Sequence, residues 1–139
     1  MQSQVRQQIV EEARSWVGTR YHHQQSVKGV GCDCVGLIRA CGELVGVKYT
    51  DNWNYARTPH PSTMLQLLDK YLVKKSISTI KPGDVICFRI ESDPCHLALF
   101  TGAGIIHAYA KTVRKVIEHE LTLYWSERVV RVYKFHGVD

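Results

Sequence analysis

The first segment of the chain alternates apolar and polar residues with the period of a helix. Its apolar positions recur every three or four residues, at Val5, Ile9, Ala13 and Trp16-Val17. This spacing predicts an amphipathic helix that ends at Gly18, since glycine is a common helix stop. Residues 18 to 31 lack a regular pattern, and we expect them to form a loop.

A second helix is predicted to begin at Cys34, directly after Asp33. One face carries Cys34, Ile38, Cys41 and Val45, and Gly46 supplies a stop signal. Residues 47 to 61 contain aromatic and turn residues without periodicity. A short third helix is expected from Ser62, with an apolar face made of Met64, Leu65, Leu68 and Leu72.

The second half of the chain has the pattern of an antiparallel sheet. After the turn Lys81-Pro82-Gly83-Asp84, short runs rich in β-branched and aromatic residues are separated by turn signals. These runs read DVICFRI, CHLALF, GIIHAYA, RKVIEHE and ERVVRVYKF. Helices followed by such strands predict an α+β fold, with helices on one face of a roughly five-stranded antiparallel sheet.

Length and composition fit a single domain over residues 1–139. With 45% hydrophobic and 22% charged residues the chain is ordinary for a soluble protein, and a core of this size needs no disulfide or metal. No segment approaches the roughly 18 uninterrupted apolar residues of a membrane span. The net charge of +5 comes from scattered basic residues, so we expect no nucleic-acid partner.

The first residues of the chain bear on its cysteine chemistry. Glu11 and Glu12 stand where a secretory signal would need an apolar stretch, so we expect synthesis in the cytoplasm without a signal peptide. That compartment opposes stable disulfides, and five cysteines cannot all pair within one chain. Free thiols are therefore expected.

Three of the five cysteines fall within GVGCDCVGLIRACG, residues 29–42, and their positions separate their expected roles. A thiolate at the first turn of a helix is stabilised by the helix dipole and by unpaired backbone N–H groups, which can also hold an oxyanion. Cys34 has this position. Cys41 lies two turns deeper on the same face, where a buried small residue is expected, and Cys32 lies in the preceding loop.

A nucleophilic cysteine also needs a base and a group that orients the base. The strands CHLALF and GIIHAYA are expected to form a hairpin around residues 101–104. This hairpin places His96 opposite Tyr109 and diagonal to His107, on one face of the sheet. The sequence therefore predicts a base beside its orienting group.

Two other uses of the cysteines stay open. Cys32, Cys34 and a histidine such as His22 or His23 could bind zinc, although Cys95-His96 is a distant second ligand pair. Cys32 and Cys34 could also form a redox pair, although such motifs favour two intervening residues. We expect neither a metal nor another cofactor.

Five short motifs occur in a familiar order. They read Gly18-Thr19-Arg20-Tyr21, Asp33-Cys34-Val35-Gly36-Leu37, Pro82-Gly83-Asp84, His96-Leu97-Ala98-Leu99 and Ile106-His107-Ala108. In this order they resemble the motifs of the NlpC-type cysteine peptidases, papain-like bacterial and phage endopeptidases that cut peptidoglycan stem peptides. The resemblance covers residues from about 5 to 110 and implies a papain-like fold.

The resemblance also implies a mechanism, namely amide hydrolysis through an acyl-enzyme. Cys34 would be the nucleophile, His96 the base and His107 the group that orients His96. Tyr21 and the backbone N–H of Cys34 would stabilise the oxyanion. The bond cut would join D-glutamate to the diamino acid of the stem peptide. Substrate contacts are expected from Asp33, Val35, His22 and His23.

Departures from the family pattern point to a particular branch. Val35 replaces the usual serine, Arg20 the proline, and His22-His23-Gln24-Gln25 the twin glycines. With GVGCDC and Asp51-Asn52-Trp53, these residues resemble the branch found beside phage tail genes and gene transfer agents. That branch implies delivery to the periplasm or wall by a tail particle, with other tail proteins as partners.

Two alternatives to a peptidase stay open at this point. One is a catalytically silent tail-assembly or wall-binding module of the same fold. The other is a papain-like acyltransferase, amidase or thioesterase, which keeps the acyl-enzyme and changes the acceptor.

Overall fold

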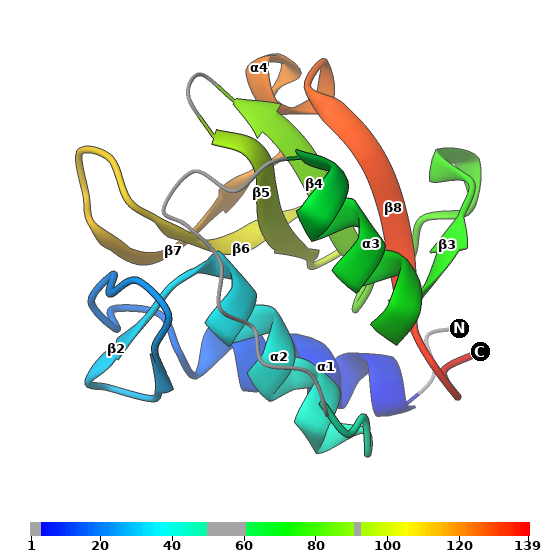
Figure 1. Cartoon of the computed structure of the whole chain (residues 1–139), viewed down its shortest axis with the longest axis horizontal. Helices are drawn as coiled ribbons and strands as arrows, with labels where there is room; N and C mark the ends of the chain where they lie inside the picture. The colour runs from blue at the N-terminus through cyan, green and yellow to red at the C-terminus, as the bar shows by residue number, and fades with distance from the viewer. Residues whose placement is uncertain (1–3, 50–60, 91–92) are drawn as a thin grey trace.

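The computed structural model describes residues 4–49, 61–90 and 93–139, and within this part of the chain it contains four α-helices (Figure 1). These are α1 (Gln4–Arg14), α2 (Cys34–Leu44), α3 (Pro61–Tyr71) and α4 (Leu123–Ser126). Each described helix is too short or too polar to reach across a bilayer. The loop expected over residues 18 to 31 contains a small antiparallel ribbon of β1 (Ser26–Val27) and β2 (Gly31–Cys32).

The main sheet has six strands in the order β3-β8-β4-β5-β6-β7, and all neighbours are antiparallel. Its strands are β3 (Leu72–Lys75), β4 (Val85–Ile90), β5 (Asp93–Phe100), β6 (Gly104–Tyr109), β7 (Lys115–Glu120) and β8 (Val129–Phe135). The α+β class is confirmed, with one strand more than the sequence predicted. The extra strand β3 follows α3 directly, so Leu72, assigned to the helix from its spacing, pairs with Phe135 in the sheet.

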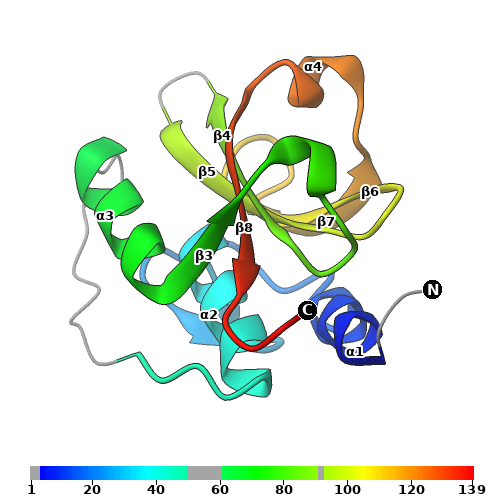
Figure 2. The same cartoon turned by 90° about the vertical axis from the view of Figure 1, so that its right-hand side faces the viewer.

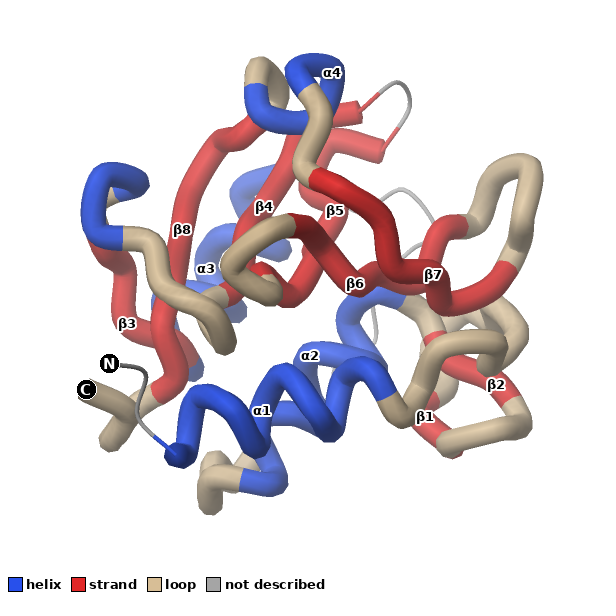
Figure 3. Tube along the Cα trace, turned by 180° about the vertical axis from the view of Figure 1, so that it is seen from behind, coloured by secondary structure: helices blue, strands red, loops and turns tan. Residues whose placement is uncertain are grey.

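Helices α1 and α2 lie together against one face of the sheet, while α3 lies beside β3 and β5 (Figures 1 and 2). Helix α2 contacts β5 and β6, the two strands of the hairpin that contains His96 and His107. Its N-terminal end lies next to β6 both in Figure 1 and from behind in Figure 3. The start of α2 therefore lies beside β6, the strand next to the edge strand β7.

Alternate residues of the central strands face two hydrophobic clusters. The larger lies between the sheet and the helices and includes Leu97, Leu99 and Ile106. The smaller is built from the other positions of the same strands and includes Phe88, Ala98, Ile105 and Trp125. Because side chains alternate along a strand, the residues at 96 and 107 belong with the smaller cluster.

A buried group of charges ties the ends of the chain to the sheet. The guanidinium of Arg6 donates to Oδ1 of Asp84 at 2.8 Å, and Nζ of Lys75 donates to Oδ2 of Asp84 at 2.7 Å. Nε of Arg6 also donates to the backbone oxygen of Asp139 at 2.8 Å. The start of α1, the turn before β4 and the C-terminal segment therefore meet at one point (Figure 2).

Candidate active site

All five cysteines lie in the described part of the chain, and their burial separates them. Cys34 is partly exposed, whereas Cys32, Cys41, Cys87 and Cys95 are buried. Burial, with a smaller contribution from Asp33, raises the pKa of Cys32 to about 12. Burial also raises the pKa of Cys41 far above its usual value, and Cys41 lies in the core as predicted. Cys34 is the thiol that a substrate can reach.

Asp33 fixes the position of Cys34 by capping the helix that begins there. Its Oδ1 accepts the N–H of Gly36 at 2.8 Å, so Cys34 is the first helical residue, as the sequence predicted. Its Oδ2 accepts the N–H of Gln24 at 2.7 Å, which ties the preceding loop to the helix start. Asp33 is 1% exposed, so the structure shows a positioning role for this carboxylate.

Gly36 allows the loop to pass directly over the first turn of α2. A Cβ at this position would lie 2.2 Å from the backbone oxygen of Gln25, well inside van der Waals contact. The hydroxyl of Ser26 donates to the backbone oxygen of Gly36 at 2.7 Å. The glycine of the motif is therefore needed for the close approach of loop and helix.

Tyr21, His22 and His23, in the loop before the cysteines, differ in how far they are buried. Tyr21 is half-buried and packs against the same hydrophobic cluster as Cys34, and its backbone N–H donates to the oxygen of Arg114 at 2.9 Å. His22 is exposed, with Nδ1 3.1 Å from the backbone oxygen of His23. His23 is partly buried, with Nδ1 3.9 Å from Oδ2 of Asp33.

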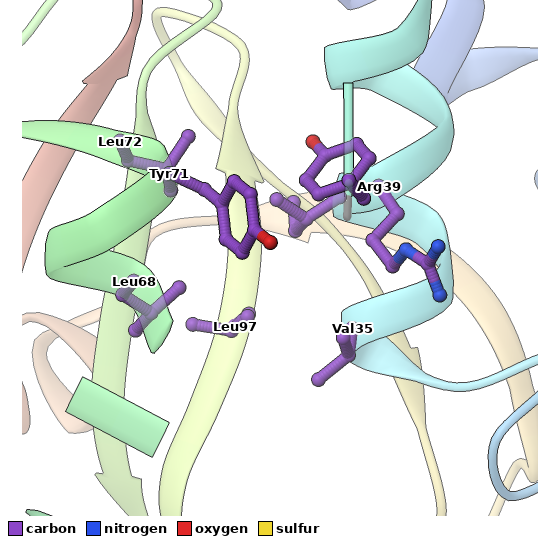
Figure 4. A pocket seen from close by; sticks show the side chains of 8 residues that line it. Val35, Arg39, Leu68, Tyr71, Leu72 and Leu97 are labelled. Atoms are coloured by element: carbon purple, nitrogen blue, oxygen red, sulfur yellow. The ribbon is translucent and has the colours of Figure 1, made fainter. Parts of the chain in front are cut away.

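Val35 points into a small apolar pocket between α2, α3 and β5. Figure 4 shows its side chain across from Leu68 and Leu97, with Tyr71 at the other side of the pocket. Val35 is 2% exposed and belongs to the helix-side core. This burial explains why an apolar side chain suits the position, and the expected substrate contact of Val35 stays a prediction.

His96 and His107 meet on the sheet as the hairpin register predicted. Strands β5 and β6 pair Leu99 with Ile106, and Nε2 of His96 lies 2.7 Å from Nδ1 of His107. The two side chains are buried, at 2% and 0% exposure. The ring of Tyr109 lies 6.0 Å from that of His96, measured between centroids. The predicted contact of the two histidines is confirmed.

A third histidine, which the sequence analysis missed, extends this pair. Nε2 of His107 lies 2.8 Å from Nε2 of His119, and Nδ1 of His119 lies 2.8 Å from the backbone oxygen of Glu120. The indole of Trp125 packs against all three imidazoles, with centroid distances of 5.8, 4.9 and 5.6 Å along the series. We call His96, His107 and His119 the histidine row.

The middle imidazole of the histidine row is kept neutral. Burial, followed by the neighbouring His96 and His119, lowers the pKa of His107 to about 2. A neutral imidazole has one nitrogen that donates and one that accepts. His107 can therefore orient a neighbour on each side without carrying charge itself.

The described residues do not form a group of ligands that would support the zinc hypothesis. Within residues 4–49, 61–90 and 93–139, no three His, Cys, Asp or Glu side chains are gathered so that they could hold a metal ion. Cys95, considered as a distant ligand, is buried with its Sγ 2.6 Å from Sγ of Cys87.

Comparison with known proteins agrees with this arrangement. The model of the NlpC/P60 family matches residues 16–134. Gamma-DL-glutamyl hydrolase of Bacillus subtilis (strain 168) is 22% identical over 137 residues, which are 94% of this chain and 29% of that protein. The chain thus spans less than a third of that relative's length.

Two solved structures match the chain over nearly their full length. The NlpC/p60 domain of the peptidoglycan hydrolase SagA superposes with a TM-score of 0.68 at 21% identity, covering 94% of this chain and 98% of that one. RipD of Mycobacterium tuberculosis, described as a non-catalytic NlpC/p60 domain protein, gives 0.63 at 15% identity, covering 97% and 99%. At these identities the likeness concerns the fold. The chain belongs to the NlpC/P60 family and has its papain-like α+β fold.

Proposed function

We propose that this protein is a cysteine endopeptidase that hydrolyses amide bonds in peptidoglycan stem peptides. The observation that carries the proposal is the buried 2.7 Å contact between His96 and His107. Both histidines pack on Trp125 of the smaller cluster, whereas Cys34 packs against the helix-side cluster, so the approach of Sγ of Cys34 to His96 is itself part of the proposal. A base with its own orienting group is what nucleophilic catalysis by a thiol requires. Membership of the NlpC/P60 family supports peptidoglycan as the substrate.

The proposed reaction proceeds through an acyl-enzyme. Sγ of Cys34 attacks the scissile carbonyl, a C–S bond forms, and the thiol proton passes to His96. The backbone N–H of Cys34 and the hydroxyl of Tyr21 stabilise the negative carbonyl oxygen. The C–N bond then breaks and the departing amine takes the proton from His96. Water, activated by His96, hydrolyses the thioester and restores the thiol.

The proposed scissile bond joins D-glutamate to the diamino acid of the stem peptide. The name of the Bacillus subtilis relative, a gamma-DL-glutamyl hydrolase, supports cleavage at a glutamyl bond. The loop that contains His22 and His23 is tied to the start of α2 through Asp33 and supplies the proposed substrate contacts.

The direct test is incubation with purified muropeptides of several wall chemistries, with products identified by mass spectrometry. We expect the wild type to release the two halves of the stem peptide and Cys34→Ala to release none. Cys32→Ala is the matched control, because it removes a buried thiol two positions away and should keep turnover. Identical product traces from wild type and Cys34→Ala across all substrates would refute the peptidase.

The same assay separates the alternatives. A silent module, such as the family also contains in RipD, would retain muropeptides without cleaving them. A transferase would pass the acyl group to an added amine in preference to water, giving an amide product of larger mass. The presence of Cys34 together with His96 and His107 favours hydrolysis over a silent module.

We also propose that a phage or phage-like tail carries the enzyme to the periplasm or wall, with other tail proteins as partners. The support is the sequence resemblance of residues such as Val35 and the GVGCDC segment. Asp51-Asn52-Trp53, which contributes to that resemblance, lies outside the described residues. Detection of the protein by mass spectrometry in purified tail particles tests this, and its absence from them would refute it.

A further inference from the structure

We propose that His119 is a positioning residue that sets the tautomers of the whole histidine row, so that His96 keeps its proton on Nε2 and its lone pair on Nδ1. The assignment of His96 as the catalytic base rests on the proposed function. The direction of the hydrogen bonds along the row follows from these contacts when His119 and His107 are neutral, and it can be measured without any turnover.

The backbone oxygen of Glu120 gives the row its direction. A carbonyl oxygen only accepts hydrogen bonds, so the contact at 2.8 Å requires that Nδ1 of His119 carries the proton. A neutral imidazole with its proton on Nδ1 has a lone pair on Nε2. His119 therefore presents an acceptor to His107.

The direction then passes from ring to ring. Nε2 of His107, at 2.8 Å from Nε2 of His119, must donate, so Nδ1 of neutral His107 accepts. Nε2 of His96, at 2.7 Å from that Nδ1, must donate in turn. The lone pair of neutral His96 is left on Nδ1, the nitrogen proposed to receive the thiol proton of Cys34.

The same arrangement accommodates both protonation states of the base. When His96 takes up the thiol proton, its Nε2–H continues to donate to Nδ1 of His107, so no other ring has to turn. A proton added to His119 would instead make its Nε2 a donor that faces the Nε2–H of His107. To relieve that clash, the proton of His107 moves from Nε2 to Nδ1, which then donates to Nε2 of His96. The proton of His96 consequently moves to Nδ1. The active row therefore requires a neutral His119.

The surroundings of His119 are compatible with this role. One side of the ring packs on Trp125, with centroids 5.6 Å apart, and on His107, with centroids 4.9 Å apart. The ring also borders a hollow of about 220 Å³ that is lined by Thr101, Ala103, Gly104, Glu118 and Glu120. Glu118 is already paired with Arg14 at 2.9 Å. His107, Glu118 and Glu120 are titratable groups beside the ring, and His107 makes the ring-to-ring bond.

Long-range ¹H–¹⁵N correlation spectra of the ¹⁵N-labelled full chain at neutral pH test the proposal, because they report which nitrogen of each neutral imidazole carries the proton. We expect a proton on Nε2 in His96 and His107 and on Nδ1 in His119. A proton on Nδ1 of His96, or on Nε2 of His119, would overturn the assignment. Failure of muropeptide cleavage with these tautomers present would refute the peptidase and leave the row intact.

Substitutions at position 119 provide the kinetic readout. His119→Gln keeps an acceptor near the Nε2 position and should hold kcat within about threefold. His119→Phe removes the acceptor and His119→Lys replaces it with donors. Both should lower kcat on the order of 10- to 1000-fold with little change in KM, since a wrongly held base costs up to about 10⁴-fold in serine proteases.

His136→Phe is the matched control, because His136 is an exposed histidine outside the row. It should behave as wild type. Unchanged kcat in His119→Phe and His119→Lys, or a loss in His119→Gln as large as in His119→Phe, would overturn the proposal. The spectra of the wild type decide it even if a variant fails to fold.

Discussion

Two polar clusters lie toward opposite ends of β4 and β5, and they differ in how their polar groups are satisfied. Asp84, just before β4, is bound by the cations of Arg6 and Lys75, at 2.8 and 2.7 Å. The histidine row, beginning opposite Phe88, joins three bases through hydrogen bonds of 2.7 to 2.8 Å and ends on a backbone carbonyl. In the first cluster unlike charges satisfy one another, whereas in the second the lowered pKa of the middle imidazole, His107, keeps that ring neutral.

The difference separates stability from chemistry. Removing one partner of a buried ion pair leaves an uncompensated charge, which is costly, so the Asp84 cluster is expected to hold the fold together. Neutral imidazoles need only hydrogen bonds, and a row of them keeps one basic nitrogen ready to accept a proton. We therefore expect substitutions in the histidine row to lower activity and substitutions in the Asp84 cluster to lower stability.

The largest effect is expected for His96→Ala, which should lower kcat/KM for muropeptides on the order of 10⁴-fold or more, because the thiol loses its base. The free energy of unfolding should change far less than activity, as measured by urea denaturation followed by circular dichroism. Wild-type turnover in this variant would remove the histidine row from the mechanism.

At the other end, Arg6→Met should lower the free energy of unfolding by about 3–5 kcal/mol, since Asp84 keeps its burial and loses a cation. The same urea titration measures it. Arg14→Met is the control, because Arg14 and Glu118 form an exposed pair, with side chains 51% and 32% exposed, and should cost at most about 1 kcal/mol. Equal losses of unfolding free energy in Arg6→Met and Arg14→Met would contradict the view that the Asp84 cluster stabilises the fold more than an exposed ion pair does.

The pH dependence of stability sharpens the contrast further. In the unfolded chain a histidine binds a proton below about pH 6.5, whereas in the fold the pKa of His107 is lowered to about 2. The unfolded state therefore binds more protons between these values, and stability is lost as the pH falls through this window. One such group contributes a slope of up to about 1.4 kcal/mol per pH unit.

Unfolding titrations between pH 7 and 4 measure this slope. We expect a shallower dependence in His107→Asn than in the wild type. Parallel curves for wild type and His107→Asn would show that His107 does take up a proton in the folded state.

The smallest effect is expected for Trp125→Phe. The indole packs on His107 at 4.9 Å and on Phe88 at 5.2 Å between centroids, and a smaller ring leaves part of this cover unfilled. We expect a loss of about 1–2 kcal/mol in stability and a rise in the pKa of His107, as burial weakens. NMR titration of the imidazole resonances checks the shift. An unchanged pKa would assign the neutrality of His107 to its histidine neighbours instead.

The sequence predicted best those features that local rules control. The apolar face of Cys34, Ile38, Cys41 and Val45 predicted a helix that begins at Cys34, and α2 begins there, capped by Asp33. The tight hairpin over residues 101–104 determined which residues face one another, so the contact of His96 with His107 followed from spacing. The family assignment from five short motifs is likewise confirmed by the match over residues 16–134.

His119 was missed because its place depends on a register that the sequence does not encode locally. The connection between β6 and β7 turns through Thr112 and Arg114, whose φ angles are +59° and +53°, and neither residue type marks a left-handed turn. The pairing of His107 with Ile117 puts His119 diagonal to it. Strand β3 was missed for a related reason, since LVKK follows α3 without a turn and does not alternate.

The last acceptor of the histidine row is a main-chain atom, and this has a consequence for how the site tolerates mutation. The bond from His119 ends on the carbonyl oxygen of residue 120, which every amino acid possesses. Side-chain replacements at position 120 therefore leave the reference point of the row in place. Of the atoms that determine the direction of hydrogen bonding along the row, this one belongs to the backbone, and a substitution at position 120 does not remove it.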